Sequence, residues 1–127
     1  MSYGYNKKVY LTYSKAIEKI KEELKKEGFG ILTEIDVKAA LKKKLDVNYG
    51  DYIILGACNP KFAYKALQAE KEIGLMLPCN VIVYRDKNET FVSAILPTEA
   101  MSMIDNEELR SIAVQVEEKL KKAVDNV

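Results

Sequence analysis

The feature that most constrains the fold is an apolar run at residues 52–57, Tyr-Ile-Ile-Leu-Gly-Ala. A run with no polar alternation is typical of a strand inside a sheet that is covered on both faces. Two more strands are expected at 79–85 and 90–96, and the polar residues 86–89 between them predict a hairpin turn. The chain is therefore expected to build a mainly antiparallel sheet with residues 52–57 in its interior.

Strand and helix patterns alternate through the first third of the chain. Strands are expected at about 5–12 and 29–35, separated by a helix that Ser14 caps and Gly28 ends. Asp36 can cap a second helix. The apolar stripe of this second helix consists of Val37, Ala40, Leu41 and Leu45.

Two more helices are expected in the second half of the chain. Asn59 and Pro60 fit the cap and the first position of the third helix. Residues 97–103 predict a short helical turn or loop, and Asp105 with Glu108 forms a capping box for the last helix. This helix has the clearest apolar stripe in the chain, made up of Leu109, Ile112, Ala113, Val116, Leu120, Ala123 and Val124.

Composition bounds the class of protein. The 127 residues suit one domain, 1–127, and 20 basic against 19 acidic residues leave a net charge of +1. This balance gives no strong attraction to nucleic acid or to an anionic membrane. Without a membrane-length apolar run or a secretory signal, the chain is expected to be soluble and cytoplasmic. The absence of histidine excludes histidine-dependent hydrolases and histidine zinc ligands within this chain.

The candidate site residues lie in two Cys-Asn motifs. Cys58, Asn59 and Pro60 follow the apolar run, where a strand ends and a helix begins, and Cys79 and Asn80 open a later strand. A thiol at a helix start ionises more readily, and an asparagine amide could contact a bound group. The other interpretation is structural, because free cysteines are often core residues and asparagines often cap or turn the chain.

The spacing of the motifs predicts where the two thiols meet. Cys58 ends one expected strand and Cys79 begins another. If these two strands are antiparallel neighbours, both thiols lie at one rim of the sheet. The third helix would then arch between them. Cys58 is expected to react faster with alkylating reagents, and Cys79 is expected to behave as an ordinary thiol.

A resemblance to a known family covers nearly the whole chain. The residues that carry it are Gly56-Ala57-Cys58-Asn59-Pro60, Ala63, Ala66-Leu67, Gly74-Leu75-Met76-Leu77-Pro78-Cys79-Asn80-Val81, and the stretches 28–37 and 101–105. The chain resembles the family called domain of unknown function 302. The resemblance implies a two-layer α+β fold, with a curved, mainly antiparallel sheet of about five strands and helices packed on it, in a TATA-binding-protein-like β-α-β4-α arrangement. It also implies a homodimer, and it implies no known activity.

Three functional hypotheses remain open beside a purely structural role for the motifs. The first is a homodimeric binding module that holds a small molecule or a partner near Cys58, Asn59, Cys79 and Asn80. The second is a thiol-dependent enzyme or redox protein using Cys58, with Cys79 as resolving thiol. The third is a soft-metal site of thiolates. No cofactor, nucleic-acid or membrane partner is expected. Apolar residues that could contact a second copy, or belong to the core, are Tyr3, Tyr5, Leu75, Met76, Leu77, Met101, Met103 and Ile104.

Overall fold

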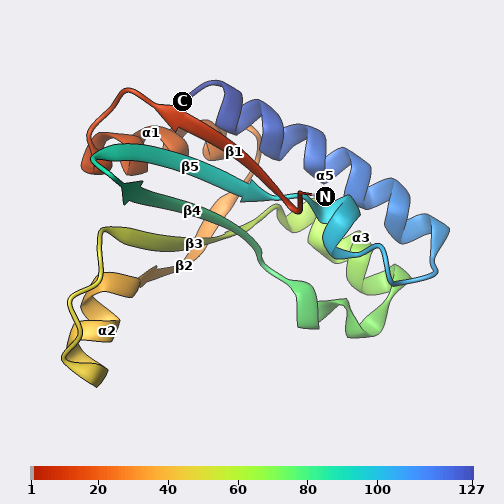
Figure 1. Cartoon of the computed structure of the whole chain (residues 1–127). Coiled ribbons are helices and arrows are strands. Elements are labelled where there is room, and N and C mark those ends of the chain that lie inside the picture. Colours follow the sequence, from red (N-terminus) through yellow and green to blue (C-terminus); the bar gives the residue numbers. More distant parts are fainter. Residues whose placement is uncertain (1) are drawn as a thin grey trace.

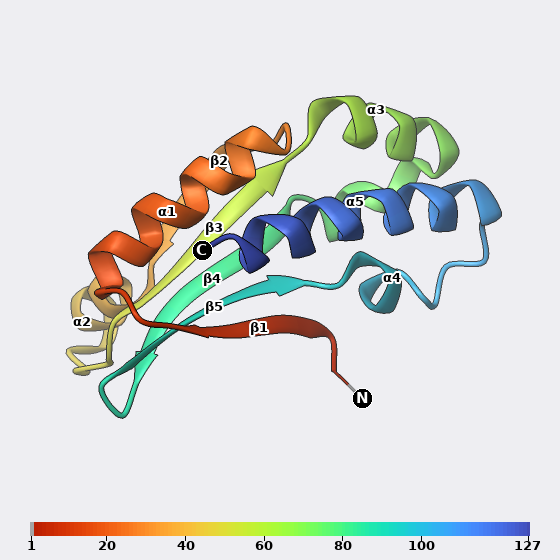
Figure 2. The same cartoon turned by 90° about the horizontal axis from the view of Figure 1, so that it is seen from above.

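The computed structural model describes residues 2–127 and has two layers. One layer is a five-stranded antiparallel sheet in the order β1-β5-β4-β3-β2. The other contains α1 and α5, which lie side by side on one face of the sheet (Figures 1 and 2). The elements are β1 (Gly4–Val9), α1 (Tyr13–Lys26), β2 (Gly30–Asp36), α2 (Val37–Leu45), β3 (Tyr52–Cys58), α3 (Pro60–Ala69), the 3-10 helix η1 (Lys71–Met76), β4 (Cys79–Asp86), β5 (Glu89–Ile95), α4 (Pro97–Ala100) and α5 (Glu107–Asp125). The expected two-layer α+β architecture is confirmed.

Strand β3 contains the apolar run and lies inside the sheet, as expected. It pairs with β2 on one side and with β4 on the other, and β4 is the middle strand. The hairpin of β4 and β5 is also confirmed, with Lys87 and Asn88 in the turn at positive φ. One expectation fails, because helices cover only one face of β3 in the structure (Figure 1).

The core lies between this covered face and the helices α1 and α5. Its fully buried side chains include Ile20 and Leu24 of α1, Leu55 of β3 and Val81 of β4. All seven residues of the predicted stripe in α5 are buried. Burying one such side chain stabilises the fold by roughly 1.5–3 kcal/mol, so this interface dominates the stability of the domain.

The helix caps differ from the predicted ones by one or two residues. Thr12, and not Ser14, caps α1, because its side chain accepts a hydrogen bond from the Lys15 N–H at 3.2 Å. Asn106, and not Asp105, caps α5, and its side chain accepts from the Leu109 N–H at 3.0 Å. In both cases the residue in extended backbone conformation just before the helix takes the cap.

Gly28 ends α1 as predicted. Its φ of +91° is left-handed, and the Phe29 N–H donates to the Leu24 carbonyl at 2.9 Å, which is the hydrogen-bond pattern of a Schellman motif. Phe29 and Leu24 are both buried. This turn brings Phe29 beneath the helix layer, where it reaches the candidate site.

Helix α2 contributes little to the core, and Val37, Ala40 and Leu41 of its apolar stripe are only partly buried. Asp36 caps it as expected, accepting from the Ala39 N–H at 2.9 Å. No residue of α2 is buried, however, and Leu45 is 66% exposed. Figure 1 places α2 beyond the ends of β2 and β3, away from α1 and α5. No helix of the part that the structure describes is long and apolar enough to cross a membrane.

Candidate functional site

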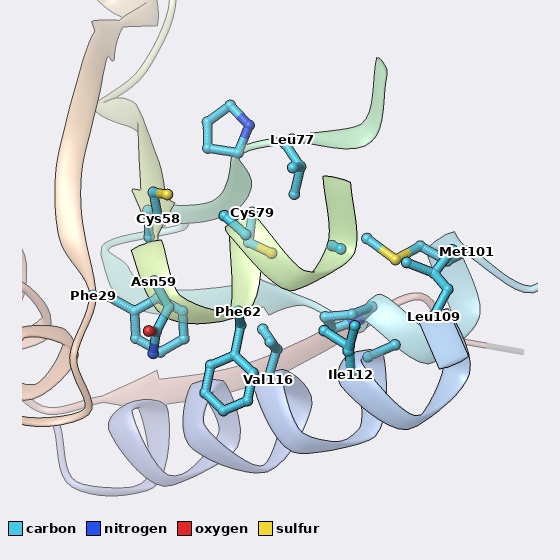
Figure 3. A pocket seen from close by; sticks show the side chains of 16 residues that line it. Phe29, Cys58, Asn59, Phe62, Leu77, Cys79, Met101, Leu109, Ile112 and Val116 are labelled. Atoms are coloured by element: carbon cyan, nitrogen blue, oxygen red, sulfur yellow. The ribbon is translucent and has the colours of Figure 1, made fainter. Parts of the chain in front are cut away.

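The two cysteines lie at the same rim of the sheet, as the antiparallel arrangement predicts. Strands β3 and β4 are antiparallel neighbours, and Ala57 of β3 lies directly opposite Cys79 of β4. Cys58, the next residue of β3, is therefore one position away from Cys79 along the ladder. The chain leaves Cys58 through Asn59 into α3 and returns through η1 to Cys79, so α3 arches over this rim (Figure 3).

Cys79 is buried, and its environment differs from the ordinary thiol that was predicted. Its side chain is 8% exposed, and burial raises the pKa of the thiol to about 11, with a smaller contribution from the nearby Cys58. Cys79 is buried by the tertiary structure, because α3 and α5 cover the first residue of β4. At neutral pH the Cys79 side chain is a protonated, weakly polar group of the core. Cys58 is partly buried.

The register does not favour a disulfide between the two cysteines. Cross-strand disulfides need Cβ atoms about 3.8 Å apart that face each other. Here Ala57, and not Cys58, faces Cys79, and consecutive residues of a strand point to opposite faces. Figure 3 agrees, since the Cys79 sulfur points towards the α5 side and the Cys58 sulfur does not.

A cavity separates α3 from α5 and the ends of the strands. Cys58, Asn59 and Cys79 contribute to its wall, whereas Pro60 and Asn80 do not. Its other lining residues are apolar: Phe29, Ala57, Phe62, Ala63, Ala66, Leu77, Pro78, Pro97, Met101, Leu109, Ile112, Ala113 and Val116 (Figure 3). The volume is about 30 Å³, which is room for about one water molecule and far below the several hundred Å³ of a typical ligand pocket.

Asn59 has a different structural role from the predicted cap. Its side chain makes no capping hydrogen bond, and its Nδ2 instead donates to the Glu27 carbonyl at the end of α1, at 3.1 Å. Pro60 is the first residue of α3, as predicted. The contact ties the start of α3 to the end of α1.

The other end of α3 is held by a residue that the sequence did not single out. The Asn106 Nδ2 donates to the Ala69 carbonyl, the last residue of α3, at 2.9 Å. Asn106 also caps α5, so one side chain joins the two helices that enclose the cavity. Between these two ties α3 buries one residue, Ala66. Helix α3 is therefore held at both ends by asparagine side chains and between them by the packing of Phe62 and Ala66 on the core.

Asn80 lies away from this cavity. It is exposed and pairs with Gly56 of β3, on the face of the sheet that the helices leave open. Of the two predicted Cys-Asn motifs, the structure therefore brings together the two cysteines and Asn59. Among residues 2–127, His, Cys, Asp and Glu side chains do not gather in groups of three or more that could hold a metal ion.

Comparison with known proteins identifies the family. The model of the family described as domain of unknown function DUF302 matches residues 5–127. A crystal structure of an uncharacterized conserved DUF302 protein from Bacillus stearothermophilus is similar, with a TM-score of 0.94 and 30% sequence identity, covering 99% of this chain and 98% of that one. A search of curated proteins finds no match. The chain belongs to the DUF302 family.

Proposed function

We propose that this DUF302 domain is a homodimeric binding module that takes up a small, mainly apolar molecule beneath α3. The observation that carries the proposal is the cavity at the rim of the sheet, which is lined by apolar side chains and covered by α3, a helix with one buried residue, Ala66. In the structure this site is closed. Ligand entry requires α3 to move outwards.

The chemistry of the wall favours an apolar ligand. Apart from the two cysteines, Asn59 is the one polar residue in the lining. The raised pKa of Cys79 keeps that thiol neutral at physiological pH, so it adds no charge. A ligand with an apolar body and one polar end, which could reach Asn59, fits this wall best.

Opening α3 breaks two hydrogen bonds and exposes the apolar side chains Phe62 and Ala66, which pack on the core. Each of the two asparagine ties is a single hydrogen bond to a backbone carbonyl, which contributes about 0.5–1.5 kcal/mol net. The ring of Phe62 faces the Nζ atoms of Lys65 and Lys119, at 5.8 and 6.0 Å from its centroid. Lys119 belongs to α5 and Phe62 also lines the cavity, so these weak cation–π pairs lie where α3 meets α5. A ligand that buries apolar surface can offset their loss.

The test is an NMR titration of ¹⁵N-labelled protein with indole, benzene and n-hexanol. We expect shifts confined to α3, α5 and the ends of β3 and β4, with saturation in the micromolar to millimolar range. Ala113→Leu fills the cavity and should abolish these shifts, because Ala113 is a buried wall residue. Ala39→Leu is the matched control, since Ala39 is exposed on α2 and outside the wall. Binding of none of the probes, or equal binding to both variants, would contradict the proposal.

A thiol-dependent enzyme or redox protein is the second candidate. The position of both cysteines at one rim favours it. Against it, Cys79 is buried and protonated, and no histidine is present to activate Cys58. A soft-metal site has weaker support still, because the metal would have to displace the proton of a thiol whose pKa is about 11.

A further inference from the structure

A surface groove lies at the end of the sheet where β1 leads into α1 and where the chain turns between β4 and β5. Its walls come from the end of β1, the loop before α1, the first residue of α1 and the β4–β5 hairpin. Figure 2 shows the hairpin and the start of α1 at the end of the sheet away from α3. The groove holds about 570 Å³, which is within the range of small-molecule sites. It shares no residue with the cavity beneath α3 and is therefore a separate candidate site.

Two polar side chains lie side by side in this groove. Arg85 of β4 and Thr90 of β5 are opposite residues of the hairpin ladder, and Val9 of β1 lies opposite Thr90. All three point to the side of the sheet that carries the helices, because Val83 and Val92, two positions away along the strands, are core residues. Helix α1 packs on β4 and β5, so this row of side chains runs beneath its first turn.

Thr90 is a buried polar residue without an internal partner. It is 4% exposed, and its hydroxyl makes no hydrogen bond to another group of residues 2–127. Across the same residues, no fully enclosed side-chain oxygen or nitrogen lacks a partner, so the Thr90 oxygen is an atom that reaches the groove. Buried hydroxyl groups are normally hydrogen-bonded. The free hydrogen-bonding capacity of Thr90 therefore points into the groove.

Arg85 brings a positive charge that no ion pair neutralises within the described part of the chain. Two carboxylates lie near it, and each has another partner. Glu89 shares the groove and pairs with Lys8. The carbonyl of Asp51 accepts from the Arg85 N–H at 3.1 Å, whereas its carboxylate pairs with Lys38 at 3.4 Å. A free guanidinium can donate two parallel hydrogen bonds to the oxygens of one anion.

The start of α1 adds backbone donors to the groove. Thr12 caps the third N–H group of the helix, and the N–H groups of Tyr13 and Ser14 have no hydrogen-bond partner in residues 2–127. The first turn contains no acidic residue, so the positive end of the helix dipole is not offset there. Burial, with smaller contributions from Asp36 and Asp51, raises the pKa of Tyr13 to about 12. The Tyr13 side chain is therefore neutral at physiological pH and adds no negative charge.

We propose that this groove binds a small phosphate monoester, with the phosphate between Arg85, Thr90 and the first N–H groups of α1. The three kinds of donor come from two strands and a helix, so they approach the bound group from different directions. A phosphate offers three oxygens around one centre and can accept from all of them, whereas a carboxylate offers two oxygens in one plane. The ring of Tyr10 is 88% exposed and lines the groove, where the organic part can pack on it. This site is additional to the cavity of the proposed function.

The test is an NMR titration of ¹⁵N-labelled protein with phenyl phosphate at constant ionic strength and neutral pH. We expect amide shifts confined to residues 8–14 and 85–90, with a Kd of about 1 mM or lower. Arg85→Gln should weaken binding about tenfold or more, and Thr90→Val, which keeps the shape and removes the hydroxyl, about threefold or more. The matched control is Lys87→Gln, which removes a charge of the same sign from the same hairpin but outside the groove wall, and should change the Kd by less than about twofold.

The outcomes test the site and the ligand class separately. An absence of shifts, shifts outside these two segments, or an equal Kd for Arg85→Gln and Lys87→Gln overturns the site. Phenol or benzoate binding as tightly as phenyl phosphate overturns the phosphate class. Circular dichroism checks folding, and Arg85→Gln keeps the test valid if Thr90→Val is unfolded, because Arg85 is exposed. Indole added to the same samples reports on the cavity beneath α3, so either proposal can fail without the other.

Discussion

Replacing Gly56 by alanine tests how β3 meets the segment that leads into β4. A Cβ atom at this position would contact the Thr33 Oγ1 far inside its van der Waals distance and would lie 2.8 Å from the Pro78 Cγ. The threonine belongs to the neighbouring strand β2, opposite Gly56, and the proline ring immediately precedes Cys79. The missing side chain of Gly56 is therefore what allows both groups to lie against β3.

The magnitude follows from the rigidity of the two neighbours. A hydroxyl can rotate away, but a proline ring cannot, so the strand or the segment before β4 must shift. Overpacking of this kind typically costs about 1–3 kcal/mol. For a domain of this size the melting temperature should fall by roughly 4 °C for each kcal/mol. We expect Gly56→Ala to be destabilised within this range, and to alter the amide shifts of Cys79 as well.

Urea unfolding of wild type, Gly56→Ala and Gly30→Ala at one protein concentration measures this effect. Gly30 is the matched control, because it also lies in a strand and a Cβ there would meet nothing within 4 Å. It has no positive φ, so alanine is expected to leave the stability unchanged or to raise it by up to about 1 kcal/mol. Equal stability of Gly56→Ala and Gly30→Ala would refute the reasoning about Thr33 and Pro78.

Three further predictions concern the thiols and the cap of α5. With iodoacetamide at neutral pH, Cys58 should react first and Cys79 only slowly, because the pKa of Cys79 is about 11, and Cys58→Ser should remove the fast reaction. The same raised pKa means that folding stability should fall as the pH rises from about 9 to about 11, since the unfolded thiol loses its proton first. Two equally fast thiols, or two that react only on unfolding, would contradict the first expectation. Asn106→Ala should lower the free energy of unfolding by about 1–2 kcal/mol and speed amide hydrogen exchange in α3, because it removes the cap of α5 and the tie to Ala69. Asp105→Ala is the control. It removes only an exposed ion pair with Arg110 and should change the free energy of unfolding by less than about 1 kcal/mol.

The sequence predicted the elements whose pattern is long and periodic. The stripe from Leu109 to Val124 matches the buried residues of α5, because seven positions at helical spacing leave one possible inner face. The caps were harder, since Thr12 and Ser14 both suit a helix start, as do Asp105 and Asn106. Which of two nearby residues adopts the extended backbone just before the helix depends on how the preceding strand or loop packs, and the local pattern does not contain this information.

The candidate site was predictable in position and less so in chemistry. Antiparallel pairing of β3 and β4 was enough to place both cysteines at one rim. The burial of Cys79 depends on α3 and α5, which are remote in sequence, so the raised pKa could not be read from its neighbours. The ties of Asn59 to Glu27 and of Asn106 to Ala69 join residues more than thirty positions apart, and no local motif marks such contacts.

The alternation of side chains along β3 and β4 separates the two faces of the sheet. Ala57 and Cys79 point towards the helices and line the cavity, whereas Ile54 and Ile82, an opposite pair of the same two strands, point to the other face. A charge introduced at Ile82 therefore acts on the face that lacks the cavity, and its effect on a ligand would have to pass through the backbone of β4. That strand is the middle one of the five and pairs on both edges, with β3 and β5. A substitution such as Ile82→Glu should therefore leave the cavity wall in place.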